Sequence, residues 1–155
     1  MNLNYKYVLF DFDNTLATHM SYAPGTDDVE LVAYLKGNTF FYDVEKSKHL
    51  QKFMDLLYEK HVPMGLCSAI SVDTMSIRAE AKIEWVIDNY GYRLKNMCVK
   101  SWSAKSKMCE LLQQALGCNA KEILIIDDSY DVLEDCARKG FSVCTPLHIV
   151  NLISQ

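Results

Sequence analysis

The sequence predicts an α/β protein built on a doubly wound, three-layer parallel sheet. Short, wholly apolar runs alternate with longer segments in which apolar residues recur at helical spacing. This alternation is typical of βαβ units, whose strands run parallel and are buried on both faces. The chain has 155 residues, the size of one domain, so we expect residues 1–155 to form a single domain.

The first strand is predicted at residues 5–10, an apolar run of aromatic and β-branched residues that ends at Asp11. Residues 17–45 are mixed in character and contain a Pro-Gly pair, an acidic patch and an aromatic run. We interpret this segment as a small insert or flap, with a short helix near 28–36 and a hairpin.

Four helix-and-strand pairs are predicted after the insert. Each helical segment carries apolar residues three and four positions apart, and Gly117 and Gly140 follow two of the segments where a C-cap is expected. The predicted order is helix 46–60, strand 64–67, helix 73–89, strand 96–99, helix 105–116, strand 122–126, helix 130–139 and strand 141–144.

Charge and composition exclude several classes of function. The 16 basic and 20 acidic residues give a net charge of −4, which argues against a nucleic-acid binder with a basic surface. Nucleic acid is therefore expected only as a substrate. No apolar run is long enough to span a bilayer and no secretory signal is evident, so we expect a cytoplasmic protein with no membrane partner. The six cysteines include no CxxC pair and are interpreted as reduced, mostly buried thiols.

Polar side chains follow three of the predicted strands. Asp11 and Asp13 follow the first strand, Ser68 follows the second, and an acidic cluster at 127–131 follows the strand at 122–126. Because the carboxyl ends of parallel strands lie at one edge of the sheet, we expect these groups to meet there. Carboxylates that lie close together repel one another unless a cation is present, and hard oxygen ligands favour Mg²⁺.

This set of groups favours phosphoryl transfer. Asp11 and Asp13 are two positions apart, so one carboxylate can attack phosphorus while the other moves a proton. The Ser68 hydroxyl and the Ala69 backbone N–H can donate to phosphoryl oxygens. Lys105 opens the predicted helix before the acidic cluster, from which its ammonium group can reach the same edge.

The same residues resemble the four motifs of the haloacid dehalogenase superfamily of phosphohydrolases, and the resemblance extends along most of the chain. Asp11, Asp13 and Thr15 match the first motif, Asp-x-Asp-x-Thr, and Ser68 matches the second. Lys105 is the best match to the third motif. The fourth, an acidic cluster after a strand, is matched by Asp127 and Asp128, with Asp131 three positions beyond.

The resemblance implies a role for each residue. Asp11 would form an aspartyl-phosphate and Asp13 would act as general acid and base, with Ser68 and Lys105 holding the phosphoryl group. Mg²⁺ would bind the Asp11 carboxylate, the Asp13 backbone carbonyl and Asp127. Thr15 is usually structural in the family and ties the loop after the first strand.

Three assignments stay open. Lys100 follows the predicted strand at 96–99 and is the alternative to Lys105 as the motif lysine. Asp128 and Asp131 belong either to the metal site and its surroundings or to an ordinary loop and helix start.

The gaps between the motifs are too short for a full cap domain, so the chain looks like a capless member, somewhat like the small magnesium-dependent phosphatases. The resemblance thus implies a phosphatase that acts on a phosphorylated small molecule or macromolecule. An open site admits a large substrate, whereas an oligomer in which a neighbouring subunit closes the site would select a small one. The alternatives are a phosphotransferase or phosphomutase, and a non-catalytic module of the same fold that binds phosphate or protein.

Overall fold

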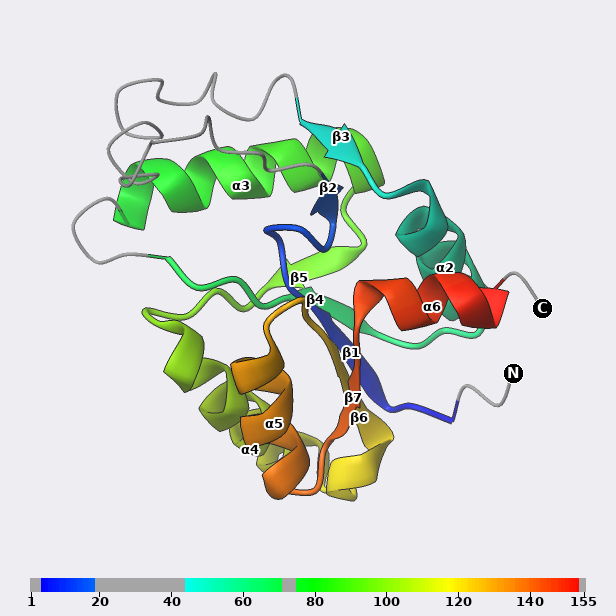
Figure 1. The fold of residues 1–155 in the computed structure, drawn as a ribbon, viewed down its shortest axis with the longest axis vertical. Helices are drawn as coiled ribbons and strands as arrows, with labels where there is room; N and C mark the ends of the chain where they lie inside the picture. Colours follow the sequence, from blue (N-terminus) through cyan, green and yellow to red (C-terminus); the bar gives the residue numbers. More distant parts are fainter. Residues whose placement is uncertain (1–3, 19–43, 71–74, 154–155) are drawn as a thin grey trace.

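A computed structural model of the chain describes residues 4–18, 44–70 and 75–153 (Figure 1). Its main sheet has five parallel strands in the order β5-β4-β1-β6-β7. The strands are β1 (Tyr7–Phe10), β4 (Met64–Leu66), β5 (Leu94–Asn96), β6 (Ile123–Ile126) and β7 (Ser142–Cys144). The helices are α2 (Lys48–Glu59), α3 (Met75–Tyr90), α4 (Lys105–Leu116), α5 (Tyr130–Arg138) and α6 (Pro146–Ile153).

Helices cover both faces of the sheet, because alternate residues of a strand point to opposite sides. Val8 and Phe10 of β1 pack into one cluster with side chains of α2, α3 and α6. Tyr7 and Leu9 pack into a second cluster with side chains of α4 and α5. Figure 1 shows these two groups of helices on opposite sides of the strands. The predicted doubly wound, three-layer architecture is confirmed.

The strand order places a topological switch point between β1 and β6. Chain connections lead from β1 outwards through β4 to β5, and then cross back over β1 to β6 and β7. In open α/β sheets, ligands bind at the carboxyl ends of the strands where the order reverses in this way. The residues after β1 and β6 therefore lie at the position that the fold favours for a site.

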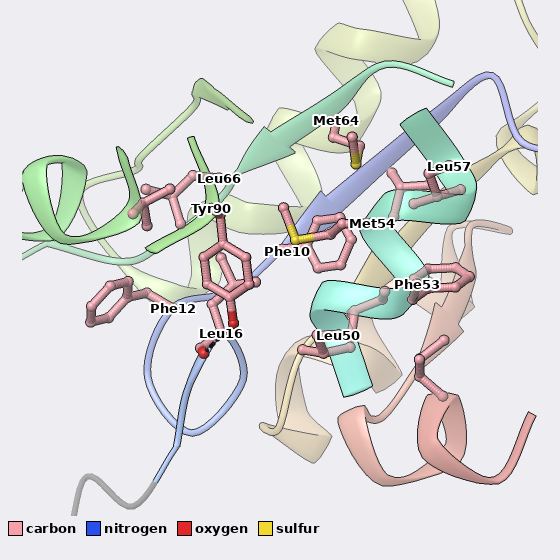
Figure 2. Close-up of a cluster of buried hydrophobic side chains, with 14 of the residues drawn as sticks. Phe10, Phe12, Leu16, Leu50, Phe53, Met54, Leu57, Met64, Leu66 and Tyr90 are labelled. Carbon is pink, nitrogen blue, oxygen red and sulfur yellow. Dashed lines mark hydrogen bonds between the residues drawn. The ribbon is translucent and has the colours of Figure 1, made fainter. Parts of the chain in front are cut away.

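The buried cluster beside α2 and α3 fixes the loop that follows β1 (Figure 2). Phe10 meets Phe53 of α2 edge to face, with ring centroids 6.3 Å apart. The Tyr90 hydroxyl, at the end of α3, donates to the Leu16 carbonyl oxygen at 2.8 Å and accepts from the Ser47 N–H at 3.0 Å. One hydroxyl thus joins the β1 loop to the residue that caps α2.

Two elements differ from the sequence prediction. Strand β5 lies at Leu94–Asn96, ahead of the predicted 96–99. As an edge strand it leaves Lys95 and Asn96 exposed, so it lacks the continuous apolar run on which the prediction was based. Helix α6 was not predicted. Pro146 occupies its first position, where a proline is well tolerated, and Ile149 is buried in the cluster beside α2.

Only the ends of the predicted insert fall within the described residues. There β2 (Ala17–Thr18) and β3 (Glu45–Lys46) pair antiparallel, and the helix expected near 28–36 lies outside that part of the chain. All six cysteines are free, as expected. Among the described helices, none combines the length and the apolar character needed to cross a bilayer.

Candidate active site

The loop after β1 carries the two aspartates of the first motif. Asp11 continues the strand, since its N–H donates to the Ile126 carbonyl oxygen at 2.9 Å, and its side chain is buried. Asn14 then adopts a left-handed conformation with φ of 54°, which asparagine tolerates better than most residues. The Ala17 N–H closes the turn on the Phe12 carbonyl oxygen at 3.0 Å.

Asp127 lies next to Asp11, at the end of the neighbouring strand β6. Its side chain is fully buried, and its Oδ1 atom accepts a hydrogen bond from the Ser129 N–H at 2.9 Å. Lys105, the first residue of α4, lies between the two carboxylates. Its Nζ donates to Asp11 Oδ1 at 2.7 Å and to Asp127 Oδ2 at 2.6 Å. The structure thus brings three of the predicted site residues into one buried cluster of charges.

Burial dominates the electrostatics of this cluster. It raises the pKa of Asp11 to about 7, against the opposing effect of Lys105 and with a further contribution from Asp127. Burial alone would lower the pKa of Lys105, but the two aspartates outweigh that effect and raise it above its usual value. Lys105 therefore stays a cation at neutral pH. Because the pKa of Asp11 stays raised even beside Lys105, a second positive charge nearby would help Asp11 to ionise.

Asp128 completes a group of three carboxylates that could hold such a charge. Oxygen atoms of Asp11, Asp127 and Asp128 lie within 4.8 Å of one another. Asp128 is exposed as a whole residue. Partial desolvation of its carboxyl group, together with the nearby Asp127, raises its pKa. Three carboxylates with this spacing suit a small divalent cation that prefers oxygen ligands. Asp131, in the first turn of α5, is exposed and is not a member of this group.

A second buried lysine, which the sequence analysis missed, holds the other motif aspartate. Lys82 of α3 is 1% exposed, and its Nζ lies 2.6 Å from Asp13 Oδ2 and 2.9 Å from Ser68 Oγ. The sequence contained a signal for it. Lys82 falls on the same stripe of α3 as Trp85 and Val86, one turn away, and a lysine in an apolar stripe needs a buried partner.

Two buried oxygen atoms of the β1 loop have no hydrogen-bond partner among the described residues. They are Asp13 Oδ1 and Thr15 Oγ1. The backbone N–H of Thr15 donates to the Phe12 carbonyl oxygen at 3.3 Å, a contact within the loop after β1. Unpaired buried oxygens are uncommon in proteins, and Asp13 Oδ1 can accept a donor from a bound molecule.

Ser68 and Ala69 follow β4 at the same edge of the sheet. Ser68 is fully buried, and Ala69 extends the pairing of β4 with β5 through a bridge to Val99. Lys100 comes next in the chain and is exposed, with its side chain lining a cavity of about 640 Å³ beside α4. Of the two candidate motif lysines, it is Lys105 that contacts Asp11.

Cys67, which precedes Ser68, carries a thiol whose reactivity is suppressed by burial. Burial raises the pKa of Cys67 to about 12, so the thiol stays protonated at neutral pH. Its side chain is fully buried on the α4 and α5 side of the sheet. Cys67 therefore packs as a small apolar residue.

Comparison with known proteins identifies the fold. A Thermotoga maritima protein described as a candidate β-phosphoglucomutase superimposes with a TM-score of 0.63, at 11% identity over 96% of this chain and 98% of its own. The cobalt-bound deoxy-D-mannose-octulosonate 8-phosphate phosphatase of Haemophilus influenzae superimposes with a TM-score of 0.55, at 15% identity over 96% of this chain and 75% of its own.

A haloacid dehalogenase family enzyme of Bacteroides thetaiotaomicron, in complex with magnesium and inorganic phosphate, gives a TM-score of 0.53, at 14% identity over 91% of this chain and 93% of its own. No protein-family model matches the chain, and no curated protein matches it in sequence. At these identities the likeness is one of architecture. The chain has the haloacid dehalogenase-like fold.

Proposed function

We propose that this chain is a Mg²⁺-dependent phosphomonoester hydrolase that works through an aspartyl-phosphate on Asp11. The observation that carries the proposal is the pairing of two aspartates, two positions apart, with two different buried lysines. Asp11 contacts Lys105, and Asp13 contacts Lys82. Neighbouring carboxylates held in different environments are the arrangement that acid–base chemistry with a nucleophile requires.

The first half of the reaction forms the intermediate. A carboxylate oxygen of Asp11 attacks phosphorus, and the bond between phosphorus and the oxygen of the leaving alcohol breaks. Asp13 gives its proton to that oxygen, so the alcohol leaves neutral. The Lys105 ammonium and the Ser68 hydroxyl, together with the Ala69 N–H, bind the phosphoryl oxygens on which negative charge is concentrated.

The second half releases phosphate. Asp13, now ionised, takes a proton from a water molecule whose oxygen attacks phosphorus. The bond between phosphorus and the Asp11 oxygen breaks, which restores the Asp11 carboxylate and yields inorganic phosphate. The Asp13 side chain is 30% exposed, so its carboxyl group can exchange a proton with the alcohol and with water.

Mg²⁺ would bind at the carboxylates of Asp11, Asp127 and Asp128, with the Asp13 backbone carbonyl as a further ligand. When bound, it would neutralise the phosphoryl oxygens and favour the ionised form of Asp11. These residues suit Mg²⁺ because all of them offer the hard oxygen ligands that this ion prefers. Asp128 is an addition to the metal site predicted from the sequence.

The substrate is a phosphorylated small molecule or macromolecule, and the protein is expected to act in the cytoplasm without a membrane partner. Of the described residues between Ile70 and Lys105, those with regular structure form α3, β5 and one short turn of 3₁₀ helix, with no additional domain over the site. This supports a site with no cap inserted between the second and third motifs. The alternative is an oligomer in which a neighbouring subunit closes the site and so selects a small substrate.

Transfer to a second substrate is the alternative function, because one protein of the same fold is described as a candidate phosphoglucomutase. The deciding experiment is phosphate release from sugar phosphates, nucleotides, phosphoamino acids and phosphopeptides, with Mg²⁺ or with EDTA. Hydrolysis predicts release that needs Mg²⁺ and is independent of added alcohols. If phosphate release or phosphoryl transfer requires an added acceptor, the protein is a phosphotransferase and not a hydrolase. Bound Mg²⁺ without any turnover would favour a non-catalytic module.

A further inference from the structure

We propose that Lys82 is a positioning residue for Asp13, a role that rests on the proposed function. It would hold one oxygen of the Asp13 carboxylate and the Ser68 hydroxyl so that both groups face the reacting phosphoryl group. Its Nζ joins three elements that are far apart in the sequence: the middle of α3, the loop after β1 and the end of β4. Neither contact involves Asp11 or Lys105.

The fold itself does not explain a lysine at this position. Lys82 lies in the buried stripe of α3 among apolar side chains, with Trp85 and Val86 one turn away. A buried ammonium group loses its hydration, and replacing a buried ion pair by apolar residues is often neutral or stabilising. The Phe12 ring, whose centroid is 5.0 Å from Nζ, offsets only part of that loss. A packing role would therefore have favoured an apolar residue.

Lys82 instead orients the two groups that it contacts, the Asp13 carboxylate and the Ser68 hydroxyl. Asp13 Oδ2 is held by the ammonium group, whereas Oδ1 has no partner among the described residues. The ammonium group thus fixes the orientation of a carboxylate whose side chain is 30% exposed. Ser68 Oγ accepts from Lys82, which leaves its single O–H to be donated, and its contact with the Ala69 carbonyl oxygen is long, at 3.5 Å.

The two buried lysines consequently serve different halves of the site. Lys105 lies between Asp11 and Asp127, the nucleophile and a candidate metal ligand. Lys82 lies between Asp13 and Ser68, the proton donor and a ligand of the phosphoryl group. Loss of Lys82 should therefore impair proton transfer to the leaving group and leave the attack of Asp11 largely intact.

The test compares two substrates of similar size that differ in their need for an acid. p-Nitrophenyl phosphate releases a stable phenoxide, whereas p-nitrobenzyl phosphate releases an alkoxide that needs a proton. In single-turnover reactions with Mg²⁺, Lys82→Met should slow phosphorylation by the benzyl ester about a hundredfold, the usual worth of a general acid. It should change the phenyl ester less than about threefold, and Lys82→Arg should restore part of the benzyl rate.

Two controls separate this role from a general loss of structure. Lys46→Met removes a lysine that contacts the same helix, through the Asn89 carbonyl oxygen at 2.9 Å, and should leave both rates unchanged. In an Asp13→Asn background, Lys82→Met should cause at most about a threefold further loss, which comes from its contact with Ser68, because proton transfer is already impaired. An equal loss for both esters, or an additive loss in the double variant, would overturn the role of Lys82 while leaving the hydrolase standing. No turnover of either ester by the unmodified protein would overturn the hydrolase, and this role with it.

Discussion

Lys105 donates a hydrogen bond to Asp11 Oδ1 at 2.7 Å, across 94 residues of chain. The bond joins the first residue of α4 to the end of the central strand β1, and both side chains are almost fully buried. Removing Lys105 leaves the buried carboxylates of Asp11 and Asp127 without their cation, which is costly. This pair therefore links the stability of the protein to the chemistry proposed for it.

Asp11→Asn should abolish turnover and leave the protein folded. The amide keeps the size of the side chain and can still accept from Lys105, but it cannot form an acyl phosphate. We expect phosphate release to fall by more than about a thousandfold, as for the loss of other nucleophiles. Asp131→Asn, an exposed aspartate outside the three-carboxylate group, is the control and should change the rate by less than about twofold. Retained activity in Asp11→Asn would refute the mechanism.

Lys105→Met should destabilise the metal-free protein by about 3–5 kcal/mol, since it leaves two buried carboxylates without their cation. Urea denaturation at neutral pH measures this change. Lys107→Met is the matched control on the same helix, because Lys107 is 63% exposed and pairs only with Glu110 in the described residues; it should cost less than about 0.5 kcal/mol. Equal costs for the two variants would contradict the pairing.

Mg²⁺ should stabilise the protein through Asp127 and Asp128. At a hundredfold excess over its dissociation constant, a bound ion adds about 2.7 kcal/mol to the free energy of unfolding. Thermal unfolding with Mg²⁺ and with EDTA measures the effect. Asp127→Asn should remove it and Asp128→Asn should weaken it, whereas Asp131→Asn should leave it unchanged. A shift that survives Asp127→Asn would place the ion elsewhere.

The metal-free protein should lose stability as the pH rises from about 4 to about 7. Burial raises the pKa of Asp11 to about 7 in the folded protein, against a usual value of about 3.9 in an unfolded chain. The folded state therefore binds the extra proton in this window, and its stability falls as that proton is lost. The measurement is the difference in unfolding free energy between the unmodified protein and Asp11→Asn across this range. A difference that is constant with pH would show that Asp11 titrates normally.

Tyr90→Phe should destabilise the protein by about 1–3 kcal/mol. The hydroxyl bonds the Leu16 carbonyl oxygen and the Ser47 N–H, and its loss leaves both groups without this partner at the base of the β1 loop. Chemical denaturation gives the cost. Tyr92→Phe serves as the control, because Tyr92 is 88% exposed, and should be nearly neutral. A neutral Tyr90→Phe would mean that water satisfies both groups.

The sequence predicted the elements whose signal is local. The apolar runs that became β1 and β6 are buried in the centre of the sheet, so hydrophobicity alone located them, and the aspartates that follow them could be placed at one edge by topology. Edge strand β5 was predicted too late in the chain because half-exposed strands need no apolar run.

The contacts of Lys82 could not be predicted in the same way. They join α3 to residues 14 and 69 positions away, and no spacing in the sequence specifies which face of a helix meets which loop. Asp128 was an open alternative for a similar reason, since its distance from Asp11 depends on how the turns after β1 and β6 approach each other.

The most direct test of the aspartyl-phosphate mechanism is to trap the phosphoryl group on the protein. Reaction with p-nitrophenyl phosphate and Mg²⁺ is quenched in acid within the first turnover, and the peptides are analysed by mass spectrometry. Catalysis through Asp11 predicts one phosphate, labile to hydroxylamine, on the peptide that contains Asp11, and none in Asp11→Asn. Phosphate release by the unmodified protein with no phosphate on Asp11 at any time in the first turnover would contradict it.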